Sequence, residues 1–564
     1  MPFTLRAFLF HFFTSISLLT TGQPSAQNEG LGKDSPMSFS TRSKGFQFIV
    51  TAVASLSLTL TIIPSASADS YNPLDTPLEK GSILNYVVEN GSMERNSYLA
   101  IMPPAVTSAT ETRADKWQWC TGLDDPICDP KNNPSILKAT SILGPCLSAT
   151  EENCIDSLEI GIGEKLEKAT LIRVTDGITF PADSRYKYPG SSNISLWKTP
   201  TSSLSFAVMP RLQLYFRNGN FGEGDLFTDV IPYKEKTGDY SQIRINTSPD
   251  ATPNNRYKFA PHSTYCVFEQ DGICGIAQDF ESNTRIRIKI RVSKIVGGWF
   301  QGRLNDPTLD VSNFSTDNNL LTVEASPVSV PRMALVVKPA EFTDQEKIWA
   351  VNFGGGIYTG PQAGNPKDSF AFLDFYRDRV KDTTVGSNTF WNFSTTSWGD
   401  GSKCLQDKNK ILGIVTTNAL AYDGQSPSFV DGALNYRVAG LHLMPDGKTP
   451  VLGSYNLVMR SEIARCLYGF TNAPIQATVS IIGGENANVA TTVLGERNGW
   501  LSMAAGGFTF SEKTIQVKLS QEKAVVTPPK QTAIKTTIKC AKGKTIKKVT
   551  AVKPKCPSGY KLSK

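Results

Sequence analysis

Ten cysteine residues, all of them beyond Ala68, constrain this 564-residue chain more than any other feature of its sequence. Three pairs are spaced eight residues apart, and a disulfide of that span closes a short loop such as the end of a hairpin. By spacing and by domain, we expect the pairs Cys120–Cys128, Cys146–Cys154, Cys266–Cys274, Cys404–Cys466 and Cys540–Cys556. Spacing alone does not fix connectivity, so Cys120–Cys154 with Cys128–Cys146 stays open.

The cysteine spacing and the low number of histidines disfavour a metal site. The chain has no CxxC-type cluster, and its three histidines, His11, His262 and His442, are too few for a multi-histidine site. We therefore expect no metal and no other cofactor.

An apolar stretch near the N-terminus has the pattern of a secretory signal peptide. Arg42 and Lys44 precede the apolar run from Phe46 to Ile63, and the small residues Ala66-Ser67-Ala68 follow it. We expect cleavage after Ala68. An uncleaved anchor is the alternative, which the many serines and threonines of the run disfavour.

Export by this signal would place the rest of the chain outside the cytoplasmic membrane. Met37 stands just before the basic residues, so we expect residues 37–68 to be the signal peptide and residues 1–36 to be an upstream extension, disordered or not translated. No later stretch approaches 18 apolar residues, and we expect no membrane span after cleavage. An oxidising exterior would keep the disulfides formed. We therefore expect an extracellular or cell-wall-associated protein.

Hydrophobic residues make up 40% of the chain and charged residues 19%, with 44 glycines and 34 prolines, which favours a folded, turn-rich β protein. Period-two alternation marks strands at 212–216, at Ile243 and Ile245, and most clearly at 286–292. The last strand alternates isoleucine and valine with Arg285, Arg287, Lys289 and Arg291. Such a stripe could bind an anionic polymer, but a solvated outer face is the favoured interpretation.

One helix is predicted between two β-rich regions. Phe370, Leu373, Tyr376 and Val380 recur at helical spacing within 368–382, with Asp368 as the N-cap. We expect a mainly β fold with two antiparallel β-sandwich-like domains, this short helical segment between them, and a small disulfide-pinned C-terminal hairpin.

The turn and linker signals divide the chain after the signal peptide. The expected parts are a first β-rich domain with disulfide-pinned loops (69–335), a connecting segment with the helix (336–400), a second β-domain (401–522), a linker (523–536) and a basic C-terminal module (537–564). In the first domain, we expect residues 117–154 to form a disulfide-pinned loop.

Charge is segregated to the C-terminus. Residues 530–564 contain eleven lysines and no aspartate or glutamate, and since the whole chain carries +7, the remainder carries −4. Within this tail, Lys542-Gly543-Lys544 predicts a turn and Cys540–Cys556 a bridge, because so few residues cannot build a core. The expected polymer-binding residues are Lys539, Lys542, Lys544, Lys547, Lys548, Lys553 and Lys555.

A dense lysine cluster attracts polyanions at long range, and salt weakens the attraction. We expect an anionic cell-wall or surface polymer as the partner. An end-cap that only improves solubility is the alternative. Nucleic acid is not expected, because Tyr560 is the single aromatic residue of the tail and provides no stacking platform.

Catalytic motifs are missing from the sequence: it contains no HExxH, GxSxG or GxxxxGK[ST] pattern. His442 lies in a predicted strand, where a structural role is favoured over a general base. Asp374 and Asp378 stand four residues apart on the predicted helix, which an exposed face explains. Aromatic platforms for sugar rings are conceivable, although core packing is the commoner use of such residues; the candidates are Trp117, Trp119, Trp391, Phe393 and Trp398.

Residues 537–561 resemble a short C-terminal module that is attached to many exported actinobacterial proteins. The stretches 297–307, 438–450 and 465–470 are similar to large, uncharacterised secreted proteins of the same bacteria. This resemblance implies a Gram-positive type of cell surface and supplies no catalytic residues.

These features together predict an exported surface protein that acts in adhesion, glycan binding or envelope structure and is not an enzyme. A glycan is a further possible ligand beside the anionic polymer. The alternative is an extracellular hydrolase acting on polysaccharide, because pairs of catalytic carboxylates leave little trace in a sequence.

Overall fold

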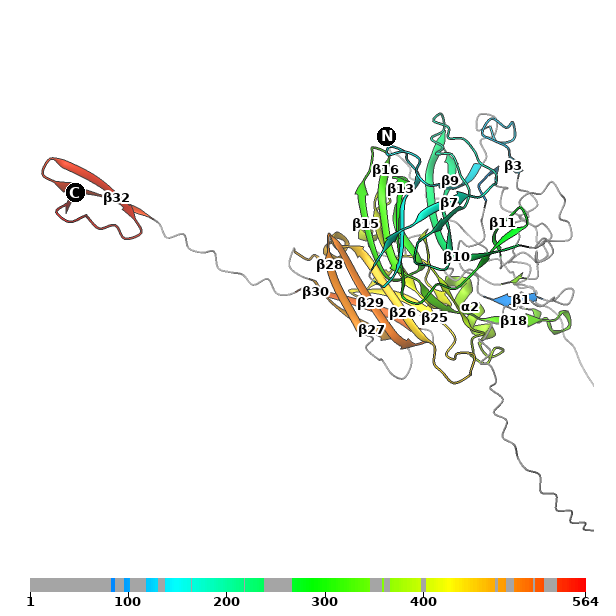
Figure 1. Ribbon diagram of the computed structural model, residues 1–564. Coiled ribbons are helices and arrows are strands. Elements are labelled where there is room, and N and C mark those ends of the chain that lie inside the picture. Colours follow the sequence, from blue (N-terminus) through cyan, green and yellow to red (C-terminus); the bar gives the residue numbers. More distant parts are fainter. Residues whose placement is uncertain are drawn as a thin grey trace, which may run out of the picture. The chain divides into compact units, whose positions relative to one another are not determined.

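The computed structural model of the protein describes residues 83–86, 96–101, 118–129, 137–163, 165–217, 219–237, 266–344, 358–359, 366–396, 402–471, 475–482, 491–510, 513–521 and 535–563. The fold is mainly β, as predicted, and the two α-helices of these residues are α2 (Pro366–Arg377) and α3 (Ser461–Tyr468) (Figure 1). Two 3₁₀ turns are also present, η3 (Pro339–Glu341) and η4 (Lys403–Leu405). The expected signal peptide and the expected strand at Ile243 and Ile245 lie outside the described residues.

A 15-stranded sheet is the largest element of the fold. Its main path runs through β28 (Thr491–Arg497), β29 (Trp500–Thr509), β26 (Leu452–Arg460), β22 (Ile411–Thr417), β14 (Gly298–Arg303), β21 (Asn392–Thr396), β10 (Asn220–Thr237), β9 (Ser205–Arg217), β4 (Leu137–Ile142), β2 (Tyr98–Ile101) and β3 (Gln118–Cys120). The other four strands are β7 (Thr170–Val174), β8 (Ser195–Lys198), β11 (Cys266–Gln270) and β12 (Ile273–Ala277).

Two five-stranded sheets accompany the long sheet. The first has the order β15 (Asn305–Asn313), β16 (Asn318–Ser326), β13 (Thr284–Ser293), β5 (Cys154–Ile162) and β6 (Glu167–Lys168). The second contains β23 (Ala421–Tyr422), β25 (Ala433–Ala439), β30 (Lys513–Gln521), β27 (Ile475–Ile482) and β24 (Ser428–Val430). Smaller pairings join β1 (Ile83–Tyr86) with β18 (Ala334–Val337) and β19 (Tyr358–Thr359), and β17 (Val328–Pro331) with β20 (Ser387–Phe390).

Each five-stranded sheet packs on the long sheet and forms a sandwich-like core with it. The first core includes the buried isoleucines of β13, where the predicted alternation is confirmed. The second core joins the second five-stranded sheet to β22, β26 and β29. Neighbouring residues of the long sheet belong to different cores, since Phe300 and Ile414 lie in the first core and Trp299 and Val415 in the second. These strands are therefore buried on both faces.

The two cores share one hydrogen-bonded sheet. β14 pairs in parallel with β22, although more than 100 residues separate them in sequence. β21, from the segment expected to connect two domains, lies between β14 and β10. The expected boundaries at 335 and 400 are therefore not breaks in the hydrogen bonding of the sheet.

The predicted helix is present but begins earlier than expected. Because α2 starts at Pro366, Asp368 is its third residue and not its N-cap. The helix ends at Arg377. Phe370, Leu373 and Tyr376 are buried, as their spacing predicted, within a core cluster that also contains Leu441.

The region expected to be a disulfide-pinned loop contains more regular structure than predicted. β4 is buried at every position and pairs with both β2 and β9 inside the long sheet. The prediction of loop structure for all of 117–154 was therefore wrong for Gln118–Cys120 and for Leu137–Ile142. In the part of the chain that the structure describes, none of the helices has the length and hydropathy that a membrane span requires.

Candidate functional site in the basic C-terminal module

The C-terminal module is a small sheet closed by one disulfide. β31 (Thr536–Lys542) pairs with β32 (Thr545–Ala551) and with β33 (Lys561–Leu562). The predicted hairpin is confirmed, and Gly543 in its two-residue turn has φ +59°, a conformation that glycine adopts without strain. The Cys540–Cys556 bridge ties β31 to the loop between β32 and β33. Cys540 is fully buried and is the only buried residue among 535–563.

The lysines of the module divide between the two faces of this sheet. Residues directly opposite one another in an antiparallel pair share a face. Lys539 is opposite Lys548, and Lys561 is opposite Ala541, which shares the face of Lys539. This face, called here the Lys539 face, therefore gathers three ammonium groups. Lys561 was not among the expected polymer-binding lysines, because a two-residue strand leaves no periodic signal.

The opposite face carries Lys542 and Lys547, which share the side of Cys540. The ammonium of Lys547 lies 5.9 Å from the ring centroid of Tyr560. Lys544 lies in the turn, and Lys553 and Lys555 lie in the loop before β33. All seven expected polymer-binding lysines are exposed, but they do not form one patch.

The cationic stripe of β13 differs from the module, because carboxylates lie opposite its arginines. Arg287 in β13 is opposite Glu159 of β5 and Glu324 of β16, with Nη1 at 2.5 Å from a Glu159 oxygen and Nη2 at 2.6 Å from a Glu324 oxygen. Arg285 also contacts Glu324 at 2.6 Å. Burial would raise the pKa of the Glu324 carboxyl, but the two guanidinium groups outweigh it and lower that pKa. The arginines of this stripe are thus matched by carboxylates of their own sheet.

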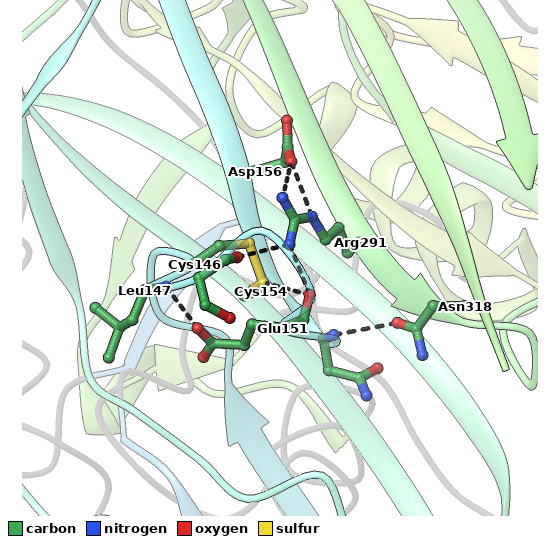
Figure 2. Close-up of a disulfide and its surroundings, with 9 residues drawn as sticks. Cys146, Leu147, Glu151, Cys154, Asp156, Arg291 and Asn318 are labelled. Atoms are coloured by element: carbon green, nitrogen blue, oxygen red, sulfur yellow. Dashed lines mark hydrogen bonds and ion pairs between the residues drawn. A yellow bond between two sulfur atoms is a disulfide. The ribbon is translucent and has the colours of Figure 1, made fainter. Parts of the chain in front are cut away.

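The loop closed by the Cys146–Cys154 disulfide lies at one end of the β13 stripe. Figure 2 shows Arg291, at the end of the same stripe, reaching this loop. Its guanidinium contacts Asp156 through Nε (2.8 Å) and Nη2 (2.6 Å), and its Nη1 donates to the carbonyl oxygens of Ser148 and Glu151 at 2.9 Å each. Arg291 therefore fixes the loop to β13.

The structure pairs all ten cysteines. The bridges are Cys120–Cys128, Cys146–Cys154, Cys266–Cys274, Cys404–Cys466 and Cys540–Cys556, and no cysteine is free. These are the pairs that we expected, and the crossed alternative within 120–154 is not formed. Among the described residues, no group of three or more histidine, cysteine or carboxylate side chains could hold a metal ion.

His442 lies in a bend after β25 and not in a strand, so that prediction was wrong. Its backbone N–H donates to Asp382 Oδ1 at 3.0 Å, and its Nδ1 contacts Asp382 Oδ2. Arg377 Nη1 lies 3.6 Å from Asp382. These contacts join the end of α2 to the bend. Asp378 follows the end of the helix and so does not extend the helical face of Asp374. His262 lies outside the described residues.

The aromatic residues considered as sugar platforms are mostly inaccessible. Trp391 and Phe393 are each 1% exposed and belong to the first core, so the favoured interpretation of core packing is confirmed for them and the platform alternative was wrong. Trp119 is half-buried and packs edge-on against Tyr98. Trp117 and Trp398 lie outside the described residues.

No protein-family model matches this chain, and no curated protein matches it. A functional proposal for this protein is therefore based on the geometry and charge of its own residues.

Proposed function

We propose that this is an exported surface protein, of the kind found in actinobacteria, whose basic C-terminal module retains it on an anionic polymer of the cell wall or cell surface. Its part in adhesion or envelope structure is one of binding and not of catalysis. The five disulfides are compatible with an oxidising exterior. The proposal depends on the lysines of the module.

The observation that carries the proposal is the contrast between two sets of cations. The arginines of β13 have carboxylates opposite them in the same sheet. The module has none, since residues 530–564 contain no aspartate or glutamate. Exposed lysines held on a disulfide-closed sheet present fixed positive charge to both sides, which suits a flexible polyanion that contacts more than one face.

The ammonium groups of the module's lysines determine which chemical groups of a ligand they can bind. An ammonium group is a strongly hydrated point charge that binds phosphate or carboxylate groups without a fixed geometry. The attraction should therefore depend on charge density, and salt should screen it over about 10 Å at 0.1 M.

Cell fractionation tests the proposal in the producing cells. One variant changes the seven expected polymer-binding lysines of the module to glutamine. A matched control changes seven exposed lysines elsewhere, Lys187, Lys198, Lys236, Lys381, Lys403, Lys408 and Lys448. We expect the module variant to move from the envelope to the medium, the control to stay, and high salt to release the unchanged protein. Equal partitioning of the three proteins would refute the proposal.

A further inference from the structure

A pocket of about 710 Å³ lies beside the Cys120–Cys128 disulfide, far in sequence from the module. Its walls come from the disulfide-closed loop, from the turn that leads to Tyr188, and from Leu99 of β2. This volume falls within the range of about 300–1,000 Å³ that is typical of small-ligand sites.

The disulfide-closed loop is held rigid by one carboxylate. Asp125 Oδ2 accepts hydrogen bonds from the backbone N–H and the hydroxyl of Thr121 at 2.9 and 3.0 Å, and its Oδ1 accepts from the Ile127 N–H at 3.0 Å. The hydrogen bond from the Thr121 backbone is the main reason that the pKa of Asp125 is lowered. Asp125 therefore links both ends of this wall by hydrogen bonds.

Arg185 joins the two polar walls. Its Nε lies 3.0 Å from Asp183 Oδ1, and its Nη2 donates to Asp124 Oδ1 at 2.9 Å across the pocket. The turn that carries it also depends on Gly190, which has φ +82° and where a Cβ would lie 2.9 Å from the Ala182 backbone nitrogen. The guanidinium of Arg185 thus lies between a carboxylate of each wall.

Apart from Thr121, the rest of the lining is apolar, and its large side chains are buried. Phe180 is 3% exposed and Leu123 is 7% exposed. Tyr188 is 2% exposed and accepts a hydrogen bond from the Ser141 hydroxyl at 2.9 Å, so it forms a fixed wall. The exposed apolar groups of Pro126, Pro181 and Ala182 can contact the C–H groups of a sugar ring while its hydroxyls bond to carboxylate and guanidinium.

We propose that this pocket binds a neutral sugar residue of a surface glycan. Three carboxylates against one guanidinium leave the lining at −2, which repels the polyanion proposed for the module. A cationic ligand would have to compete with Arg185 and with the loop donors for the same carboxylates. A sugar hydroxyl can instead accept from the guanidinium or donate to an unused lone pair.

Hydrolysis of the sugar is not part of this proposal. A glycosidase needs a carboxyl whose pKa is raised so that it stays protonated and acts as an acid. Here the hydrogen bonds from Arg185 lower the pKa of Asp183, and the pKa of Asp125 is lowered as well. Asp183 and Asp125 are therefore ionised acceptors near neutral pH.

Saturation-transfer NMR of the full-length protein with methyl glycosides of neutral hexoses and pentoses tests this inference. We expect transfer from at least one glycoside, and a titration in which Arg185→Ala weakens binding about tenfold or more. Asp124→Asn should also weaken it; because the Asp124 side chain is 81% exposed, this variant should fold normally. Lys187→Gln, in the same turn but outside the lining, should bind as the unchanged protein does.

Three results would overturn the inference. One is no transfer from any glycoside, and another is transfer that persists unchanged in both pocket variants. The third is tight binding of a lysine oligomer at these residues, which would make the pocket a cation site. None of the three affects the module, so this test fails or succeeds separately from the fractionation experiment.

Discussion

Lys539 and Lys548 lie directly opposite one another across the β31–β32 ladder. Like charges in this position destabilise an antiparallel pair. In β13, the same position opposite Arg287 is occupied by Glu324. The module thus keeps uncompensated charge within a sheet that has almost no core, and an external anion would relieve the repulsion.

Lys548→Glu should separate stability from binding in the module. The opposite charge facing Lys539 should stabilise the ladder by about 0.2–1 kcal/mol, while polymer binding weakens because the net charge of the module falls by two units. Hydrogen exchange of the β31 amides in the full chain measures the first effect, and envelope binding measures the second. Lys553→Glu is the control, since it makes the same charge change in a loop. It should weaken binding and leave the ladder as it was; equal protection of β31 in both variants would contradict this account.

Glu324 should make the first core sensitive to acid. Its pKa is lowered in the folded state by Arg285 and Arg287, so its contribution is fully present above the unfolded pKa of about 4.3 and is lost as the pH falls through the folded value. Denaturant unfolding of the protein and of Glu324→Gln from pH 3 to 7 measures this. The difference between them should be constant above about pH 5 and should shrink below it. A difference that does not change with pH would be inconsistent with the ion pairs.

Arg291→Lys should not be a conservative change. Lysine cannot contact Asp156 through two nitrogens and also reach both loop carbonyls, so we expect a loss of about 1–3 kcal/mol in the free energy of unfolding. Lys289→Arg, on the same stripe, is the control and should be nearly neutral. Wild-type stability of Arg291→Lys in urea unfolding would contradict the anchoring role of Arg291.

Asp229 and Arg211 form a buried ion pair, with Nη2 at 2.6 Å from Oδ2 and both side chains at most 5% exposed. Asp229→Ala leaves a buried guanidinium without this carboxylate, and we expect it to cost about 3–5 kcal/mol. Replacing both residues with leucine should cost less than the single change. Urea unfolding of the three proteins provides the comparison, and a double variant that is less stable than Asp229→Ala would refute this interpretation.

Local patterns of the sequence predicted the local structure well. Alternation located the strand at Thr284–Ser293, helical spacing located the buried face of α2, and a Lys-Gly-Lys turn located the C-terminal hairpin. Each of these signals is contained in fewer than twenty neighbouring residues. The eight-residue cysteine spacing is of the same kind.

Long-range pairing could not be predicted in the same way. Nothing in the residues of β14 or β22 encodes their parallel pairing, which depends on the whole chain between them. β4 was missed because its LKATSI sequence lacks apolar alternation, yet both of its faces are buried. The pocket lining comes from segments near residues 99, 124 and 185, and Lys561 joined the Lys539 face only through tertiary pairing.

The salt dependence of polymer binding tests the central claim most directly. The full-length protein and the variant with seven lysines changed to glutamine are titrated with long-chain polyphosphate at several NaCl concentrations. We predict that the logarithm of the affinity of the unchanged protein falls steeply and linearly with the logarithm of the salt concentration, and that the variant binds more weakly with a shallower slope. Equal affinities and equal slopes for the two proteins would contradict the account.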